Sequence, residues 1–230
     1  MDRIFVKKLK IFPKIYLVFK YYDLYLQIFN KFNNMKQEEI EKIKCFLDLY
    51  NPQRTVEMAL TSGIKAAARH NPLYTPNIDN KSEILDYWKS QLQCIGVKYF
   101  ESQQTEEQFK SDFLLLQSNM NTMFPKAFKS KQYVNNPGFR ISHAQKSLSV
   151  YLKHMWCIKV EQYFDNKSKN IVPEYPICPM DRTILRLVNC PNPKWVHINT
   201  MDEYNEKLEF IKTAAKKENK SLAMWELMAF

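Results

Sequence analysis

Glycine is scarce in this chain, and its scarcity limits the folds that the chain can adopt. Gly63, Gly96 and Gly138 are the three glycines among 230 residues, whereas aromatic residues make up 14%. Folds built from many short strands need turns with positive backbone φ, which glycine adopts most easily. Few such turns are possible here, and helices joined by loops rich in Pro and Asn are favoured. We therefore expect an all-α protein.

The helical periodicity starts near residue 35. Amphipathic patterns cover residues 36–50 and 53–69, and Thr105 with Gln108 forms a capping-box pattern before a further helix. A chain of this length can bury one large core or form two small lobes that share a cleft. We interpret residues 35–230 as a helical domain of two lobes.

Residues 1–34 differ from the rest of the chain. They are rich in aromatic residues and isoleucine, but Lys14, Lys20 and Asp23 interrupt the apolar runs. No run approaches the roughly 20 apolar residues of a membrane-spanning helix, and the small-residue cleavage site of a signal peptide is missing. We interpret this segment as an N-terminal extension that is separate from the helical domain, and we do not expect it to contact a membrane. A helix lying on an acidic membrane surface is the alternative.

The charge of the chain indicates an anionic partner. The formal net charge is +10 and the pI is near 9.2, which favours nucleic acid, with double-stranded DNA as the expected partner and no stable protein partner implied. Between Asp112 and Glu161 the sequence contains no carboxylate. Seven cations lie in this interval: Lys126, Lys129, Lys131, Arg140, Lys146, Lys153 and Lys159. The alternative is a solvated, lysine-rich surface without a binding role.

The cysteines and histidines do not form a recognisable metal or disulfide pattern. The five cysteines are scattered without a Cys-x-x-Cys pair, and the four histidines lack metal-ligand spacing to them. We expect no metal, no cofactor and a reducing, cytoplasmic compartment.

Lys146 occupies an unusual position on a predicted helix. Ser142 and Gln145 form a capping-box pattern at the start of the stretch "SHAQKSLSVYLKHMWC", residues 142–157. Lys146 then lies in the first turns, where the helix dipole disfavours a cation by about 0.3–1 kcal/mol. A placement that costs stability suggests a function for this lysine.

A second candidate follows 35 positions later. In the stretch "PICPMDRTILRL", Pro179 precedes Asp181 at a predicted helix N-cap. A lysine early on one helix, within Gln145-Lys146-Ser147, and a Pro-x-Asp turn opening the next resemble the helix-hairpin-helix superfamily of DNA glycosylases. The branch it is most similar to is the 8-oxoguanine glycosylases in their archaeal form. The resemblance covers roughly residues 138–190, and Arg186 falls where the family often has an arginine.

The resemblance implies roles for Lys146 and Asp181. Cleavage of a base from deoxyribose develops positive charge at the anomeric carbon, which the Asp181 carboxylate would stabilise. The Lys146 amine, once neutral, would attack that carbon and form a Schiff base that permits strand cleavage. A helix N-terminus and partial burial both favour the neutral amine. We therefore expect the two side chains to converge in one basic cleft between the lobes, with the catalytic segment spanning about residues 126–190.

The remaining site residues are assigned from the same reading. The family's hairpin carries glycines two apart, but here Gly138 stands alone, so the hairpin is expected to be degenerate. The predicted DNA contacts are Lys126, Lys129, Lys131, Arg140, Ser142, His143 and Lys153. Base-flipping enzymes hold the extruded base between aromatic side chains, and Phe139 and Trp156 are the candidates for that pocket.

Two functions follow from these patterns. The first is a DNA glycosylase that excises a damaged or modified base, with or without abasic-site lyase activity; the base is 8-oxoguanine by resemblance, or a modified base in foreign DNA such as phage DNA. The second is a non-enzymatic helical protein that binds nucleic acid through the basic segment. The second predicts salt-sensitive binding without cleavage and without sensitivity to the Asp181→Asn substitution.

Overall fold

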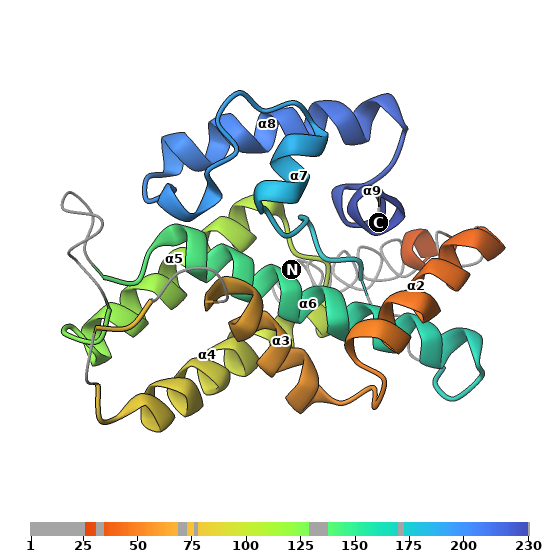
Figure 1. Cartoon of the computed structure of the whole chain (residues 1–230). Helices are drawn as coiled ribbons and strands as arrows, with labels where there is room; N and C mark the ends of the chain where they lie inside the picture. The colour runs from red at the N-terminus through yellow and green to blue at the C-terminus, as the bar shows by residue number, and fades with distance from the viewer. Residues whose placement is uncertain are drawn as a thin grey trace, which may run out of the picture.

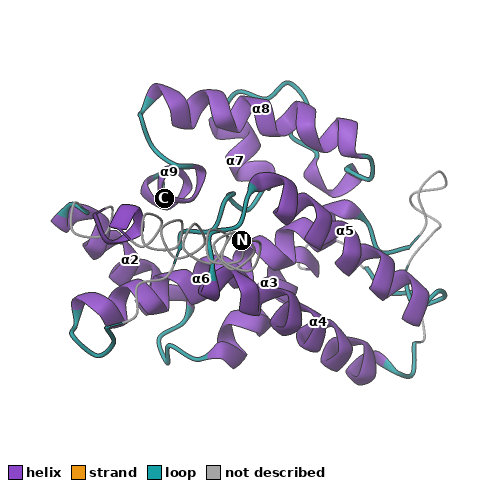
Figure 2. Cartoon of the chain, turned by 180° about the vertical axis from the view of Figure 1, so that it is seen from behind, coloured by secondary structure: helices purple, strands orange, loops and turns teal. Residues whose placement is uncertain are grey.

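The computed structural model is predominantly helical and describes residues 26–30, 35–68, 73–75, 78–128, 138–169 and 173–229. Within those ranges no β-strand occurs, and a single isolated bridge joins Tyr74 to Phe128 (Figure 2). The helices are α2 (Gln37–Tyr50), α3 (Val56–Ala68), α4 (Lys81–Glu101), α5 (Glu106–Met123), α6 (Ile141–Phe164), α7 (Arg182–Leu187), α8 (Met201–Lys217), α9 (Leu222–Met228) and the 3₁₀ turn η1 (Trp195–His197). The all-α prediction is confirmed.

Helix α6 is the centre of the molecule. In Figure 1 it runs through the middle, with α3 and α4 on one side and α7, α8 and α9 on the other. It is buried along most of its 24 residues, including the polar residues of its first two turns. A buried polar side chain must be hydrogen-bonded to be tolerated. The polar residues of α6 therefore need partners from other elements, and those partners define the site described below.

Two glycines allow neighbouring helices to approach α6 closely. A Cβ atom added at Gly63 of α3 would lie 2.6 Å from the carbonyl oxygen of Ser147. One added at Gly96 of α4 would lie 2.5 Å from the ring of Tyr151. Both distances are shorter than packed atoms allow, so α3 and α4 can pack at this spacing because these positions have no side chain.

The connection from α5 to α6 ends in a fixed turn. Residues 129–137 of this connection lie outside the described ranges. Gly138 has φ of +96°, a conformation that favours glycine, and the Asn121 side chain of α5 then holds the next residue. Asn121 Oδ1 accepts from the Phe139 amide at 2.7 Å, and Asn121 Nδ2 donates to the Phe139 carbonyl at 2.8 Å. These two hydrogen bonds fix the backbone just before the start of α6.

The helix starts test the capping predictions. Thr105 and Gln108 form the predicted capping box of α5, and Asp181 is the N-cap of α7 as predicted. The capping box predicted for Ser142 and Gln145 is wrong, because α6 starts two residues earlier than a Ser142 cap requires, at Ile141, with Arg140 as its N-cap. The side chains of Ser142 and Gln145 bind other elements instead.

The interpretation of residues 1–34 as an extension falls mostly outside the described residues, which include only 26–30 of that segment. Among the helices that the structure describes, none combines the length and the apolar character needed to cross a bilayer.

Candidate active site

Lys146 and Asp181 meet in the structure. The Lys146 Nζ atom donates to Asp181 Oδ2 at 2.6 Å, although the two residues lie on different helices and 35 positions apart. The expectation that the amine and the carboxylate converge is confirmed by this distance. Direct contact at this range makes proton exchange between the two groups geometrically possible.

The two side chains differ in their access to solvent. The Lys146 side chain is 8% exposed and that of Asp181 is 28% exposed. Lys146 lies in the second turn of α6 and is buried. The pair is thus open on the side of Asp181 and closed on the side of the lysine stem.

The start of α7 holds Asp181 in place. Asp181 is in an extended conformation, and its Oδ1 atom accepts from the Ile184 amide at 2.9 Å, as an N-cap side chain does. The cap uses one carboxylate oxygen and leaves Oδ2 for Lys146. The local helix start therefore orients the carboxylate that faces the amine.

The electrostatics of Asp181 favour its ionised form. Burial alone would raise the pKa of the carboxyl, but the charge and hydrogen bond of Lys146 and the amides of Ile184 and Thr183 lower it further than burial raises it. The net pKa lies below the ordinary value of 3.8. At neutral pH the site therefore presents a carboxylate beside the amine, which can stabilise positive charge on a substrate.

Four of the predicted DNA contacts are corrected by their burial. Arg140 is 2% exposed and Ser142 is fully buried, and both donate to the Val196 carbonyl, at 3.0 and 3.1 Å. His143 is fully buried beside Arg140, and burial first, then the Arg140 charge, lowers its pKa well below 6.5. These three residues fasten the start of α6 to the segment around η1. Side chains enclosed in this way cannot contact a phosphate in this conformation.

Lys153 is the fourth corrected contact. It is 6% exposed, and its Nζ atom donates to Glu226 of α9 at 2.5 Å and lies 4.4 Å from the centre of the Phe46 ring. Lys153 therefore joins α6 to α9 and α2 and has no free charge to offer DNA.

The remaining predicted DNA contacts belong to the connection between α5 and α6. Lys126 is exposed just after α5. Lys129 and Lys131 lie outside the described residues. Lys126 is thus the predicted contact that the structure does place at the surface.

The predicted base pocket is also corrected. Phe139 is 1% exposed and packs edge to face on Trp88 with ring centres 4.7 Å apart. Trp156 is 2% exposed and lies beside Tyr175 at 6.0 Å. Both are core residues of the folded chain, and neither lines an open cavity in this conformation.

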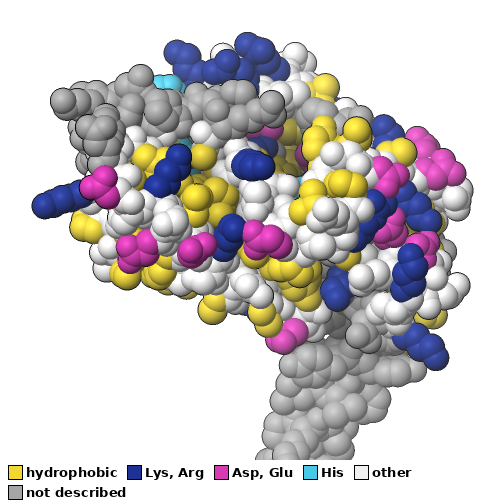
Figure 3. Space-filling model, turned by 60° about the horizontal axis from the view of Figure 1, so that its bottom comes forward, with side chains coloured by type: hydrophobic (Ala, Val, Ile, Leu, Met, Phe, Trp, Pro, Cys, Tyr) yellow, Lys and Arg dark blue, Asp and Glu magenta, His cyan; other side chains and the backbone are white. Residues whose placement is uncertain are grey.

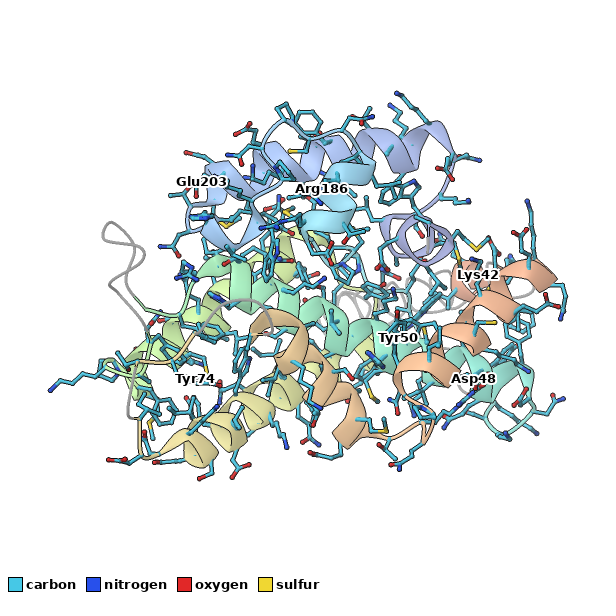
Figure 4. All side chains as sticks on the ribbon, viewed as in Figure 1. Lys42, Asp48, Tyr50, Tyr74, Arg186 and Glu203 are labelled. Carbon is cyan, nitrogen blue, oxygen red and sulfur yellow. The ribbon has the colours of Figure 1, made fainter. Side chains whose placement is uncertain are left out.

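Arg186, which the resemblance singled out, lies on α7 and is exposed. Figure 4 shows it on the short helix above α6, one turn beyond the Asp181 cap. Its side chain is therefore at the surface of α7.

A surface hollow of about 540 Å³ lies elsewhere, where α8 turns into α9. Its lining includes Lys212, Lys216 and Lys220, but neither Lys146 nor Asp181. Lys212 is paired with Glu106 and Lys220 with Glu218. Because its lining contains neither residue of the Lys146–Asp181 pair, the hollow is not part of the candidate site.

The chain was compared with protein-family models, curated proteins and solved structures, and none of them matches it. The assignment of a function therefore depends on the geometry of the site and on the resemblance in residues 138–190.

Proposed function

We propose that this chain is a DNA glycosylase with associated abasic-site lyase activity, acting on a damaged or modified base in duplex DNA. The observation that carries the proposal is the contact of 2.6 Å between a buried lysine amine and a partly exposed carboxylate. Oxidised guanine is the substrate that the resemblance implies, and a modified base of foreign DNA is the variant.

The proposed reaction starts from the Lys146 amine. After its proton moves to Asp181 or to solvent, the nitrogen lone pair forms a bond to C1′ of the sugar. The bond from C1′ to the base breaks, and its electron pair leaves with the base, which then takes up a proton. Opening of the sugar ring gives a protonated Schiff base. Loss of a C2′ proton then expels the 3′ phosphate and cleaves the strand.

Asp181 acts at two points of this sequence. Its carboxylate faces the site where C1′ gains positive charge, and fixed negative charge there lowers the barrier. Because it touches the amine directly, it can also take and return the amine proton. Both roles need the same carboxylate oxygen, Oδ2, which the helix cap leaves open.

The corrected contacts weaken the alternative of a passive nucleic-acid-binding protein. Of the seven cations between residues 126 and 159, Arg140, Lys146 and Lys153 are buried and held by protein partners. Over much of the described part of the face drawn in Figure 3, acidic and basic side chains are intermixed. A chain that only bound DNA would gain more from keeping these charges at the surface.

The test is borohydride trapping on duplex DNA that contains an abasic site. We expect a covalent complex with the native chain and none with Lys146→Gln. The matched control is Lys159→Gln, which removes the same charge from the same helix at a half-exposed position and should still be trapped. Equal trapping by the native chain and Lys146→Gln would overturn the role of Lys146, and no trapping at all would overturn the lyase activity.

A further inference from the structure

Gln145, immediately before Lys146, makes two hydrogen bonds with one distant residue. Its Nε2 atom donates to the Met180 carbonyl at 2.9 Å, and its Oε1 atom accepts from the Met180 amide at 3.3 Å. The Gln145 side chain is fully buried. One planar amide thus pairs with both backbone groups of a single residue.

The location of this pairing links it to the site. Gln145 precedes Lys146 on α6, and Met180 precedes Asp181 at the start of α7. The two hydrogen bonds between Gln145 and Met180, here called the clamp, therefore join the two chain segments one residue away from each member of the ion pair. Met180 is itself 1% exposed, so its backbone groups cannot exchange these bonds for water without local opening.

From this geometry we infer that Gln145 is a positioning residue, which sets the approach of the Asp181 carboxylate to the Lys146 amine. The inference rests on the proposed function for its catalytic meaning, but its structural content can be measured without activity. A displacement of about 1 Å at a reacting group can cost on the order of 100-fold in rate. The clamp is close enough to both groups to prevent such a displacement.

The side-chain chemistry at position 145 is specific. A carboxylate there could accept from the Met180 amide but could not donate to the Met180 carbonyl. A thioether of similar length fills the space and makes neither bond. The substitutions Gln145→Glu and Gln145→Met therefore separate the loss of one bond from the loss of both, with little change in volume.

The first experiment follows the titration of the Asp181 carboxyl by carbon NMR in the free protein. In the native chain the Lys146 contact holds this pKa below 3.8. Gln145→Met should move it upward toward the ordinary value, because Asp181 is no longer held against the amine. Gln162→Met, a change at a half-buried position of the same helix, should leave it unchanged. An unchanged Asp181 pKa in folded Gln145→Met would overturn the inference.

The second experiment measures single-turnover base release at saturating enzyme. We expect Gln145→Met to slow release by roughly 10- to 100-fold while the dissociation constant for DNA stays within about twofold. Gln145→Glu should recover rate as the pH falls, because the protonated carboxyl regains the missing donor. A rate equal to the native one in both variants, or a loss that appears only in DNA affinity, would contradict the inference.

The two experiments keep the inference and the proposed function apart. If the native chain neither releases a base nor forms a trapped complex, the proposed function fails, and the NMR titration still decides whether Gln145 positions Asp181. If Gln145→Met does not fold, Gln145→Leu, which also makes neither bond and adds no charge, is titrated in its place, with the same expected upward shift.

Discussion

Helix α6 carries two lysines that each pair with a carboxylate from another segment, and the two pairs differ in their exposure to solvent. Lys146 and Lys153 are seven residues apart, so both project from the same face of the helix. In the pair of Lys153 with Glu226 both side chains are closed off, at 8% and 7% exposure. In the pair of Lys146 with Asp181 the carboxylate is 28% exposed.

The comparison separates an enclosed pair from one that a substrate could reach. A fully enclosed pair has lost its water on both sides and can serve only to hold α6 against α9. A pair whose carboxylate reaches solvent can meet a substrate at that carboxylate. The proposed chemistry is therefore placed at Lys146 because of the solvent access of its partner, and not because a lysine lies near an acid.

The largest expected effect concerns the enclosed pair. Lys153→Met leaves Glu226 buried without its partner and should lower the free energy of unfolding by about 3–5 kcal/mol, measured by urea denaturation. The double variant Lys153→Met/Glu226→Leu should recover most of that loss. Lys146→Gln should cost clearly less, because Asp181 keeps its bond to the Ile184 amide and its solvent. Similar losses at both lysines would remove the distinction between the pairs.

The next effect concerns the open pair. Asp181→Asn should slow single-turnover base release from duplexes carrying 8-oxoguanine by about 100- to 1,000-fold, since it removes the charge that faces C1′. Stability should change little, because Asn is also a good N-cap residue and can still accept from Ile184.

Asp202→Asn, on the exposed first turn of α8, is the control for that experiment and should behave like the native chain. Native rates in Asp181→Asn would remove the catalytic role from the open pair.

A smaller effect concerns the pH dependence of stability, through His154, which is adjacent to Lys153 of the enclosed pair. Burial, and then the Lys153 charge, lowers the pKa of His154 to about 4, and the ring packs against Phe46. The folded chain keeps this histidine neutral, whereas the unfolded chain binds a proton below about pH 6.5. The contribution of His154 to the free energy of unfolding is therefore fully present above pH 6.5. It is lost toward pH 4, at about 1.4 kcal/mol per pH unit.

Urea denaturation between pH 7.5 and 5 measures how steeply the free energy of unfolding depends on pH. His143, whose pKa is also lowered, should add to it in the same direction. His154→Phe should make the slope shallower. An unchanged slope in that variant would show that His154 is not held neutral by its surroundings.

The smallest effect concerns DNA affinity. Lys126 is exposed just after α5, and Lys126→Ala should reduce the dependence of log affinity on log salt by about one unit. Lys216→Ala, at an exposed position of α8, should leave it unchanged if α8 lies away from the DNA. Equal effects of the two substitutions would indicate that DNA binds through the overall positive charge of the chain and not through the surface at Lys126.

The sequence was sufficient for the features that depend on local chemistry. Scarce glycine predicted the helical fold, and the Pro-x-Asp pattern predicted the cap that orients Asp181. Sequence reasoning also paired Lys146 with Asp181, but through a resemblance and not through spacing, since 35 residues separate them. Their contact depends on how α7 packs over α6.

The sequence failed where polar residues are buried. Arg140, Ser142, His143 and Lys153 look like surface residues by type, and the partners that bury them come from segments about 50 to 70 residues away, such as Val196 and Glu226. The same holds for Gln145, whose local spacing fitted a capping box while its actual partner is Met180. A helix that is polar in type yet central in the fold cannot be recognised from its own residues.

The most direct test of the account is to identify the residue that carries the sugar. Borohydride reduction of the complex with abasic DNA, followed by proteolysis and mass spectrometry, locates the covalent bond. The account predicts the adduct on the peptide that contains Lys146. An adduct on any other lysine or on the terminal amine, with Lys146 unmodified, would contradict it.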